Sequence, residues 1–433
     1  MMAPGHRHRT ALTSARFGRG WRLFTLNAVW FGTSFLWNAV HPLLLPTMLL
    51  SQAEGTRNTR YGLLTFGGLL VALLVQPLSG ALSDQTAHRL GRRRPWMLLG
   101  LGMGLVCLWT MALAHSFVGL ALGYVMLQLC SNILHGAAQG LIPDLVPVGR
   151  RGVASGAKSA IDMLGVVAAA LAISRVLDGT LPRIQLATLV IALVWAAGTL
   201  VTVGTVREES TVDMPRRGPK PGCLQRRAKG ARKGTQGHYA RLLAVRYCVL
   251  LSTYMVQSFA LFYLQEVLHV SNPGRVMGNI MSAIAICVML SSLPAGALSE
   301  RLGRRRLSIW AEGVVALGML GLALGRQVGQ LWLWGAVIGL GMGIFASVNW
   351  AWATDLVPVD EPAKYLGLSN LATAGAAATS RLAGPLIDLL NARWQHGGYL
   401  MLFILATLAV GVALLITQRL PEPIAVRPGA RAD

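Results

Sequence analysis

The chain has 433 residues, of which 54% are hydrophobic and only 13% are charged, and its mean hydropathy is +0.53. A soluble domain carries about 25% charged residues, so this composition excludes an ordinary soluble protein and indicates an integral membrane protein. The formal net charge of +22 would suit a nucleic-acid-binding protein, but no basic-aromatic recognition module accompanies it. We therefore expect the lipid bilayer, and no nucleic acid, as a partner.

Twelve mainly apolar runs follow one another along the chain, and each is close to the 20 or so residues that a spanning helix needs. They cover residues 22–50, 61–82, 95–114, 117–141, 153–177, 184–206, 242–269, 275–298, 307–324, 331–354, 365–389 and 399–417. The sequence therefore predicts an all-α membrane protein with 12 transmembrane helices. The division has five parts: an N-terminal tail (1–21), a six-helix bundle (22–206), a basic linker (207–241), a second six-helix bundle (242–419) and a C-terminal tail (420–433).

The lysines and arginines are unevenly shared between the two sets of loops. Most of them fall on the side that holds both termini and the segment 207–241, which is rich in Pro, Gly, Lys and Arg. That composition predicts a disordered linker lying against the lipid headgroups. The bias is the positive-inside pattern, so we expect a multi-pass protein of the cell membrane with both termini in the cytoplasm.

Polar side chains recur at helical spacing on several spans. The sets are Asn27, Trp30, Ser34, Asn38 and His41; Gln128, Ser131, Asn132, His135 and Gln139; Tyr254, Gln257, Ser258 and Gln265; and Ser347, Asn349, Trp350 and Trp352. Because such faces are costly against lipid, they predict either a shared aqueous cavity or hydrogen bonds between helices. If these faces line a cavity, we expect the hydroxyl groups of a solute to bind Asn38, His41, Gln128, Asn132, Gln257 and Asn349, with Trp350 as a stacking surface.

The fifth span carries a carboxylate near its middle. Asp162 lies about 14 Å from the start of the span at 1.5 Å per residue, and Lys158 stands one turn before it. A carboxylate at that depth is a candidate functional group. We expect either a static ion pair with Lys158 or a coupling site in which Lys158 tunes a proton-carrying or solute-binding Asp162.

Arg381, Asp388 and Glu312 are further charged residues within spans. Arg381 and Asp388 lie two turns apart, and Arg381 is deep enough to need a partner or water. We expect either a structural pair between them near the outer surface or a functional role for both. Glu312 lies about two turns inside the ninth span, where we expect it to meet the arginine block at 304–306.

Three short segments occur twice, in the same order and at nearly one offset. They are GALS at Gly80 and Gly296, RLGRRR at Arg89 and Arg301, and DLVPV at Asp144 and Asp355. The chain is therefore a duplicated unit read twice in the same direction. Each copy places a carboxylate, Asp84 or Glu300, before an arginine block in a short loop on the side of the termini. Such a loop is either a fixed cluster that sets topology or a gate that holds the cytoplasmic side shut.

Twelve spans in two parallel repeats with the loop GALSD…RLGRRR resemble the major facilitator superfamily. Within it, VQPLSGALSDQTAHRLGRRRPW is most similar to the sucrose and glycoside–cation symporter branch. The resemblance implies alternating access, with a sugar bound between the halves and transport driven by protons or sodium. By motif position it implies a gating loop made of Gly80, Asp84, Gly91 and Arg92, and of Gly296, Glu300, Gly303 and Arg304.

Two cation sites of that branch have no match here. Gln128 stands where plant sucrose carriers have an acidic residue, and the span 61–82 lacks the acidic residues of melibiose-type carriers. Asp162 is then the best proton carrier that the sequence offers, and facilitated diffusion or export stays open.

The predicted function is secondary transport of a small polar solute, a sugar or glycoside, by a functional monomer without metal or organic cofactor. An exporter of amphipathic or cationic compounds with the same fold is one alternative, and a non-transporting membrane sensor is another. The nine histidines are scattered, and neither HExxH nor GxSxG nor a phosphate loop occurs. The sequence thus predicts no enzyme, no catalytic residues and no metal site.

Overall fold

The computed structural model of the chain describes residues 19–50, 55–147, 151–177, 179–206, 208, 233–356 and 362–421. The first half consists of α1 (Arg19–Ala39), η1 (Val40–Leu44), α2 (Leu45–Leu50), α3 (Arg57–Gln85), α4 (Arg94–Ala112), α5 (Phe117–Gln139), α6 (Leu141–Leu145), α7 (Arg151–Val176) and α8 (Leu181–Thr205). The second consists of α9 (Lys233–Glu266), α10 (Pro273–Leu302), α11 (Arg304–Leu324), α12 (Val328–Leu356), α13 (Pro362–Arg381), α14 (Ala383–Arg393) and α15 (Gly397–Gln418). The predicted all-α membrane fold is confirmed.

Ten helices of the described chain are long and apolar enough to cross a membrane. The first and eleventh predicted spans complete the twelve, and both are divided. In the first span, α1 passes through the π-helical turn η1 into α2. Pro42 of η1 and Pro46 of α2 each lack the backbone N–H that a regular α-helix uses for its hydrogen bonds. In the eleventh, Pro385 cannot donate to the carbonyl of Arg381, and the helix breaks at Leu382 between α13 and α14.

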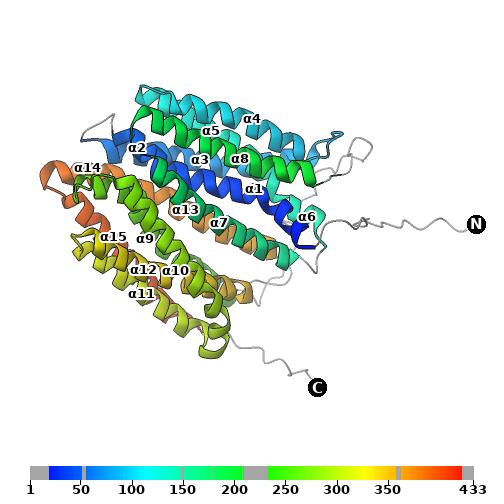
Figure 1. Cartoon of the computed structure of the whole chain (residues 1–433). Helices are drawn as coiled ribbons and strands as arrows, with labels where there is room; N and C mark the ends of the chain where they lie inside the picture. The colour runs from blue at the N-terminus through cyan, green and yellow to red at the C-terminus, as the bar shows by residue number, and fades with distance from the viewer. Residues whose placement is uncertain are drawn as a thin grey trace, which may run out of the picture.

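The helices form two bundles that follow the two halves of the sequence (Figure 1). In the first bundle α1 packs against α7 and α8, and α5 packs against α3 and α4. In the second, α12 packs against α10 and α11, and α9 packs against α13 and α15. The bundles touch each other mainly where α7 meets α10 and where α3 meets α13 and α14.

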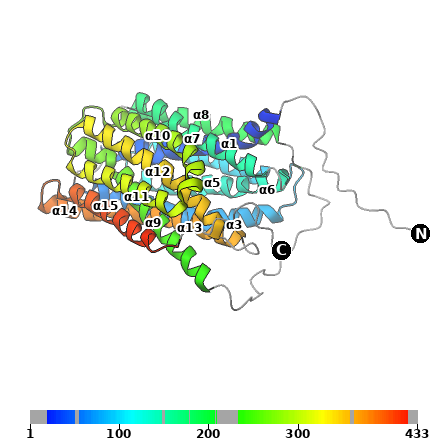
Figure 2. The same cartoon turned by 90° about the horizontal axis from the view of Figure 1, so that it is seen from below.

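The two ends of the molecule differ. Figures 1 and 2 show α14 at one end and α6, with the start of α1, at the other; we call these the α14 end and the terminus end. At the α14 end Arg57 of the first bundle pairs with Glu266 of the second at 3.5 Å, and Tyr399 donates a hydrogen bond to the same carboxylate at 2.7 Å. The side chain of Asn58 donates to Asp388 at 2.9 Å. Polar contacts thus join the bundles at the α14 end.

Glycines let the bundles approach closely there. A Cβ on Gly384 would lie 2.1 Å from the backbone oxygen of Asn58, and one on Gly62 would lie 2.3 Å from that of Arg381. A Cβ on Gly278 of α10 would lie 2.4 Å from the backbone oxygen of Ala170 in α7. Small residues at all three crossings therefore fix how tightly the bundles meet.

The described residues test only part of the predicted division of the chain. Most of the tails at 1–21 and 420–433 and most of the linker at 207–241 lie outside them. Residues 233–241, predicted as linker, already belong to α9, because Tyr239 and Leu242 are buried in the core of the second bundle.

Candidate functional site

A hydrogen-bonded network in the first bundle joins η1 to α5. His41 Nε2 lies 2.9 Å from the hydroxyl of Tyr124 and 3.2 Å from Gln128 Nε2. Gln128 Nε2 also donates to the Tyr124 hydroxyl at 2.7 Å. The indole of Trp37 stacks on the His41 ring with a centroid separation of 4.7 Å. The π-helical turn therefore places His41 against the polar face of α5.

The other two solute-binding candidates of the first half differ in their contacts. Asn132 Nδ2 donates to the backbone oxygen of Gln128 at 2.8 Å and to its side-chain oxygen at 3.1 Å, so Asn132 belongs to the same network. Asn38 instead donates to the backbone oxygen of Ser34 in its own helix. The structure brings together three of the four predicted residues and leaves Asn38 half-buried beside them.

The ion pair predicted on the fifth span is present in α7. Lys158 Nζ lies 2.8 Å from Asp162 Oδ2, and it also lies 4.0 Å from the centroid of the Trp30 ring. The hydroxyl of Ser34 in α1 donates to the backbone oxygen of Asp162 at 2.8 Å. Both α1 and α7 therefore hold this pair, and its geometry suits a static pair as well as a coupling site.

An arginine that the sequence analysis did not single out organises the second-half candidates. Arg246 of α9 donates from Nη1 to Asn349 and from Nε to Thr373, both at 3.0 Å. Its guanidinium lies 5.9 Å from the centroid of the Trp350 ring, which is 43% exposed. Gln257 is half-buried and lies about three turns further along α9. Asn349 and Trp350 are thus grouped around Arg246, and Gln257 is separate from them.

The predicted pair between Arg381 and Asp388 is wrong. Arg381 Nη1 donates to the hydroxyl of Tyr61 at 2.8 Å and to the hydroxyl of Ser258. Asp388 accepts from the side chain of Asn58 and, at 2.6 Å, from the backbone N–H of Thr59. The break at Leu382 interrupts the helical spacing on which the prediction depended.

The predicted contact of Glu312 with the arginine block is also wrong. Its carboxylate is fully buried and accepts hydrogen bonds from Ser308 at 2.9 Å and Thr417 at 2.8 Å. Glu312 therefore lies on the face of α11 that packs against α15.

The first repeat loop forms a charge cluster at the terminus end. Arg93, only 5% exposed, donates from Nε to Asp144 at 3.1 Å and from Nη2 to Asp84. The predicted Arg92 is more peripheral and pairs with Asp144 at 2.9 Å. The backbone N–H of Arg93 donates to Glu208 at 2.9 Å. The cluster joins α3, α4, α6 and the segment after α8, all within the first half of the chain.

The second loop repeats only part of this arrangement. Arg304 Nε lies 2.5 Å from Asp355 Oδ2, whereas Glu300 is exposed. Gly91 and Gly303 both have φ of +91°, a conformation that favours glycine and turns each chain into the following helix. The remaining predicted glycines, Gly80 and Gly296, make ordinary contacts with α5 and α12, since a Cβ on either would be 3.5 Å from its neighbour.

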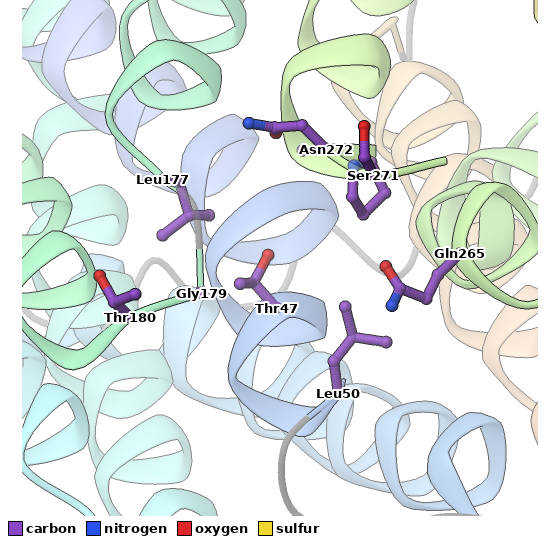
Figure 3. A pocket seen from close by; sticks show the side chains of 10 residues that line it. Thr47, Leu50, Leu177, Gly179, Thr180, Gln265, Ser271 and Asn272 are labelled. Atoms are coloured by element: carbon purple, nitrogen blue, oxygen red, sulfur yellow. The ribbon is translucent and has the colours of Figure 1, made fainter. Parts of the chain in front are cut away.

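A separate pocket of about 320 Å³ lies near the α14 end, between residues of both bundles (Figure 3). Its lining includes Thr47 and Thr180 from the first half and Gln265 and Asn272 from the second. None of the predicted solute-binding residues lines it. In the part of the chain that the structure describes, no group of three or more His, Cys, Asp or Glu side chains could hold a metal ion.

Two bundles from a duplicated sequence, with polar networks inside apolar helices, define a membrane transporter of the major facilitator superfamily. The family model described as MFS/sugar transport protein matches residues 30–384, and the chain belongs to this family.

Solved structures of other transporters have the same fold. The nucleoside transporter NupG has a TM-score of 0.69 at 12% identity, covering 92% of this chain and 98% of that one. A bacterial homologue of the human lysosomal transporter Spinster, inward-facing and occupied, has a TM-score of 0.70 at 15% identity, and the match covers 94% of this chain and 97% of that one. The peptide transporter POT has a TM-score of 0.71 at 15% identity, and the match covers 94% of this chain and 96% of that one. At these identities the likeness establishes the fold alone.

Proposed function

We propose that this protein is a secondary transporter that moves a small polar solute, a sugar or glycoside, across the cell membrane by alternating access. The observation that carries the proposal is the network of His41, Tyr124, Gln128 and Asn132 inside apolar helices. Polar side chains at membrane depth are costly unless they serve a pathway or a partner. The description of the matching family, MFS/sugar transport protein, supports the same solute class.

The solute binds between the two bundles. Amide side chains both donate and accept hydrogen bonds, which suits the hydroxyl groups of a sugar. His41, Gln128 and Asn132 bind it from the first half, with Asn38 beside them. From the second half Gln257 and Asn349 contribute, and the exposed ring of Trp350 supplies a stacking surface.

Asp162 and Lys158 form the coupling site. Protonation of Asp162 removes the charge that Lys158 pairs with, so the ion pair is lost when a proton binds. Because α7 also packs against α10 of the second bundle, a change at this pair reaches the contact between the bundles.

The terminus end faces the cytoplasm, as the positive-inside pattern predicts, and the polar contacts between the bundles hold the α14 end together. The repeat loops form the cytoplasmic gate. Asp84 and Arg93 form the surface of the gate in the first half, and Arg304 forms its surface in the second half. Gly91 and Gly303 supply the turns of the two loops. The protein works as a monomer, since each half completes the other's site.

The proposal is tested by uptake of a radiolabelled disaccharide panel into proteoliposomes, with and without an inside-alkaline pH gradient. We expect the wild type to accumulate solute against its gradient. We expect Asp162→Asn to lose accumulation while it keeps solute exchange. Equal, gradient-independent equilibration by both proteins would make this a facilitator and Asp162 a structural residue. If no sugar moves, the sugar class is wrong, and amphipathic or cationic compounds are tested in its place.

A further inference from the structure

Among the described residues, two arginines of the membrane-spanning helices have only uncharged partners. Arg381 is 8% exposed, and its Nη1 donates to the hydroxyls of Tyr61 and Ser258. Its Nε is buried and has no hydrogen-bond partner in the described part of the chain. Arg246 donates to the side chains of Asn349 and Thr373. Among the residues described by the structure, neither guanidinium has a carboxylate within ion-pair distance.

Two carboxylates inside the spanning helices, Asp162 and Glu312, have partners other than these arginines. Asp162 pairs with Lys158, and Glu312 accepts from Ser308 and Thr417 inside the second bundle. Removing a cation from water without a counter-charge is expensive, so an arginine kept among neutral groups at this depth needs an anion or water. The two guanidiniums therefore leave a positive charge that the described chain does not balance.

This charge lies next to the proposed solute site. Tyr254 stands on α9 one turn before Ser258, which Arg381 bonds, and two turns after Arg246. Tyr61, which accepts from Arg381, donates its own hydroxyl to the backbone oxygen of His41 at 2.9 Å, and His41 belongs to the first-half network. Arg381 is bonded to Tyr61 of one bundle and Ser258 of the other, so it lies where the bundles meet.

We propose that the transported solute carries an oxyanion, as a sugar acid or a sugar phosphate does, and that Arg381 and Arg246 bind that group beside Tyr254. This inference rests on the proposed function and narrows its substrate class. Guanidinium groups form planar, charge-assisted hydrogen bonds with carboxylate and phosphate oxygens. The solute's hydroxyl groups then meet His41 and Gln128, so one molecule bridges both bundles.

The test is competition for counterflow in proteoliposomes with charge-matched probes. The pairs are glucuronate against glucose and methyl β-glucuronide against methyl β-glucoside, and glucose 6-phosphate separates a phosphate requirement from a carboxylate requirement. For wild type we expect the preferred acid to compete at a concentration about tenfold or more below that of its neutral partner. Arg381→Gln and Arg246→Gln should each lower this acid preference about tenfold.

Controls separate charge recognition from folding. Arg381→Lys keeps the positive charge and should retain part of the acid preference, whereas Arg381→Gln should not. Arg175→Gln, which removes an exposed arginine at the α14 end, should leave the preference unchanged. Size-exclusion profiles and thermal midpoints of all variants show which of them fold, and Arg246→Gln provides the readout if Arg381 variants do not.

Each remaining outcome contradicts the inference. Neutral sugars that compete as well as their acids, with no change in either glutamine variant, would overturn the anionic class and leave the transport proposal standing. If no acid and no neutral sugar competes or moves, both this inference and the sugar class of the proposed function are wrong.

Discussion

Lys158 and Asp162 form an ion pair of 2.8 Å one turn apart on α7, with side chains 30% and 31% exposed. Trp30 of α1 covers the ammonium group, and Ser34 of α1 bonds the backbone of Asp162. The pair is therefore partly shielded from water and attached to two helices of the first bundle. Its strength should lie between those of surface pairs and fully buried ones.

Neutralising either partner should lower stability by more than a surface pair does. We expect Asp162→Asn and Lys158→Met each to cost about 1–2 kcal/mol, and the double variant to cost clearly less than the sum. Thermal unfolding in detergent measures the cycle, with Ser159→Ala on the exposed side of α7 as the control. Strictly additive effects would mean that the two groups do not interact.

The two neighbouring arginines of the first repeat loop should differ in importance. Arg93 is buried and bonds Asp84 and Asp144, whereas Arg92 is 22% exposed and pairs with the other oxygen of Asp144. We expect Arg93→Ala to lower stability by about 2–3 kcal/mol and Arg92→Ala by about 1 kcal/mol or less. Unfolding midpoints of the two variants give the comparison, and equal losses would contradict the structure.

Stability should depend on pH through Glu208. Burial raises the pKa of its carboxyl above the ordinary value, although the N–H of Arg93 and the charges of Arg94 and Arg93 act in the opposite direction. One of its carboxyl oxygens is buried and has no hydrogen-bond partner among the described residues. Because the folded state holds the proton more tightly, the contribution of Glu208 is most favourable at low pH and is lost as the pH rises through the raised pKa.

The matched variant for this prediction is Glu208→Gln, which cannot titrate. Between pH 7 and pH 5 we expect the thermal midpoint of the wild type to rise relative to that of the variant. If the difference in thermal midpoint between the wild type and Glu208→Gln stays constant over this pH range, the carboxyl of Glu208 is not buried as described.

The closed α14 end should open when a side chain is added at its tightest crossing. In Gly384→Ala the new methyl group would meet the backbone oxygen of Asn58, so α14 must move away from α3. To measure this, Arg183 of the first half and Arg326 of the second are each replaced by cysteine in a cysteine-free background and spin-labelled. The distance between the two labels, measured by electron paramagnetic resonance, should lengthen. Gly411→Ala adds the same group where no other atom lies within 4 Å, and its distances should match the parent's.

Composition and spacing were enough to predict the spans and the ion pair of α7. Runs of about 20 apolar residues specify spanning helices without tertiary information, and Lys158 and Asp162 are neighbours in any regular helix. The polar face of α5 was predicted in the same way, and Gln128 and Asn132 share one network.

The failures come from information that helical spacing does not contain. Arg381 and Asp388 were assigned to one continuous helix, but the chain breaks between them before Pro385. Periodicity alone did not show that Glu312 faces α15. Arg246 was not distinguished in the sequence from the many other basic residues of the terminus side. Tyr124 has the spacing of an ordinary core residue. Only packing between helices shows that Tyr124 and His41 share a hydrogen bond.

The central claim, that a solute crosses the membrane through this protein, is tested most directly by counterflow. Proteoliposomes are preloaded with unlabelled neutral and acidic sugars and diluted into trace amounts of the same sugars in radiolabelled form. The account predicts a transient accumulation of label above the equilibrium level for at least one sugar, without any ion gradient. Label that never exceeds the level in protein-free liposomes, for every sugar tested, would contradict the account and favour a non-transporting membrane sensor.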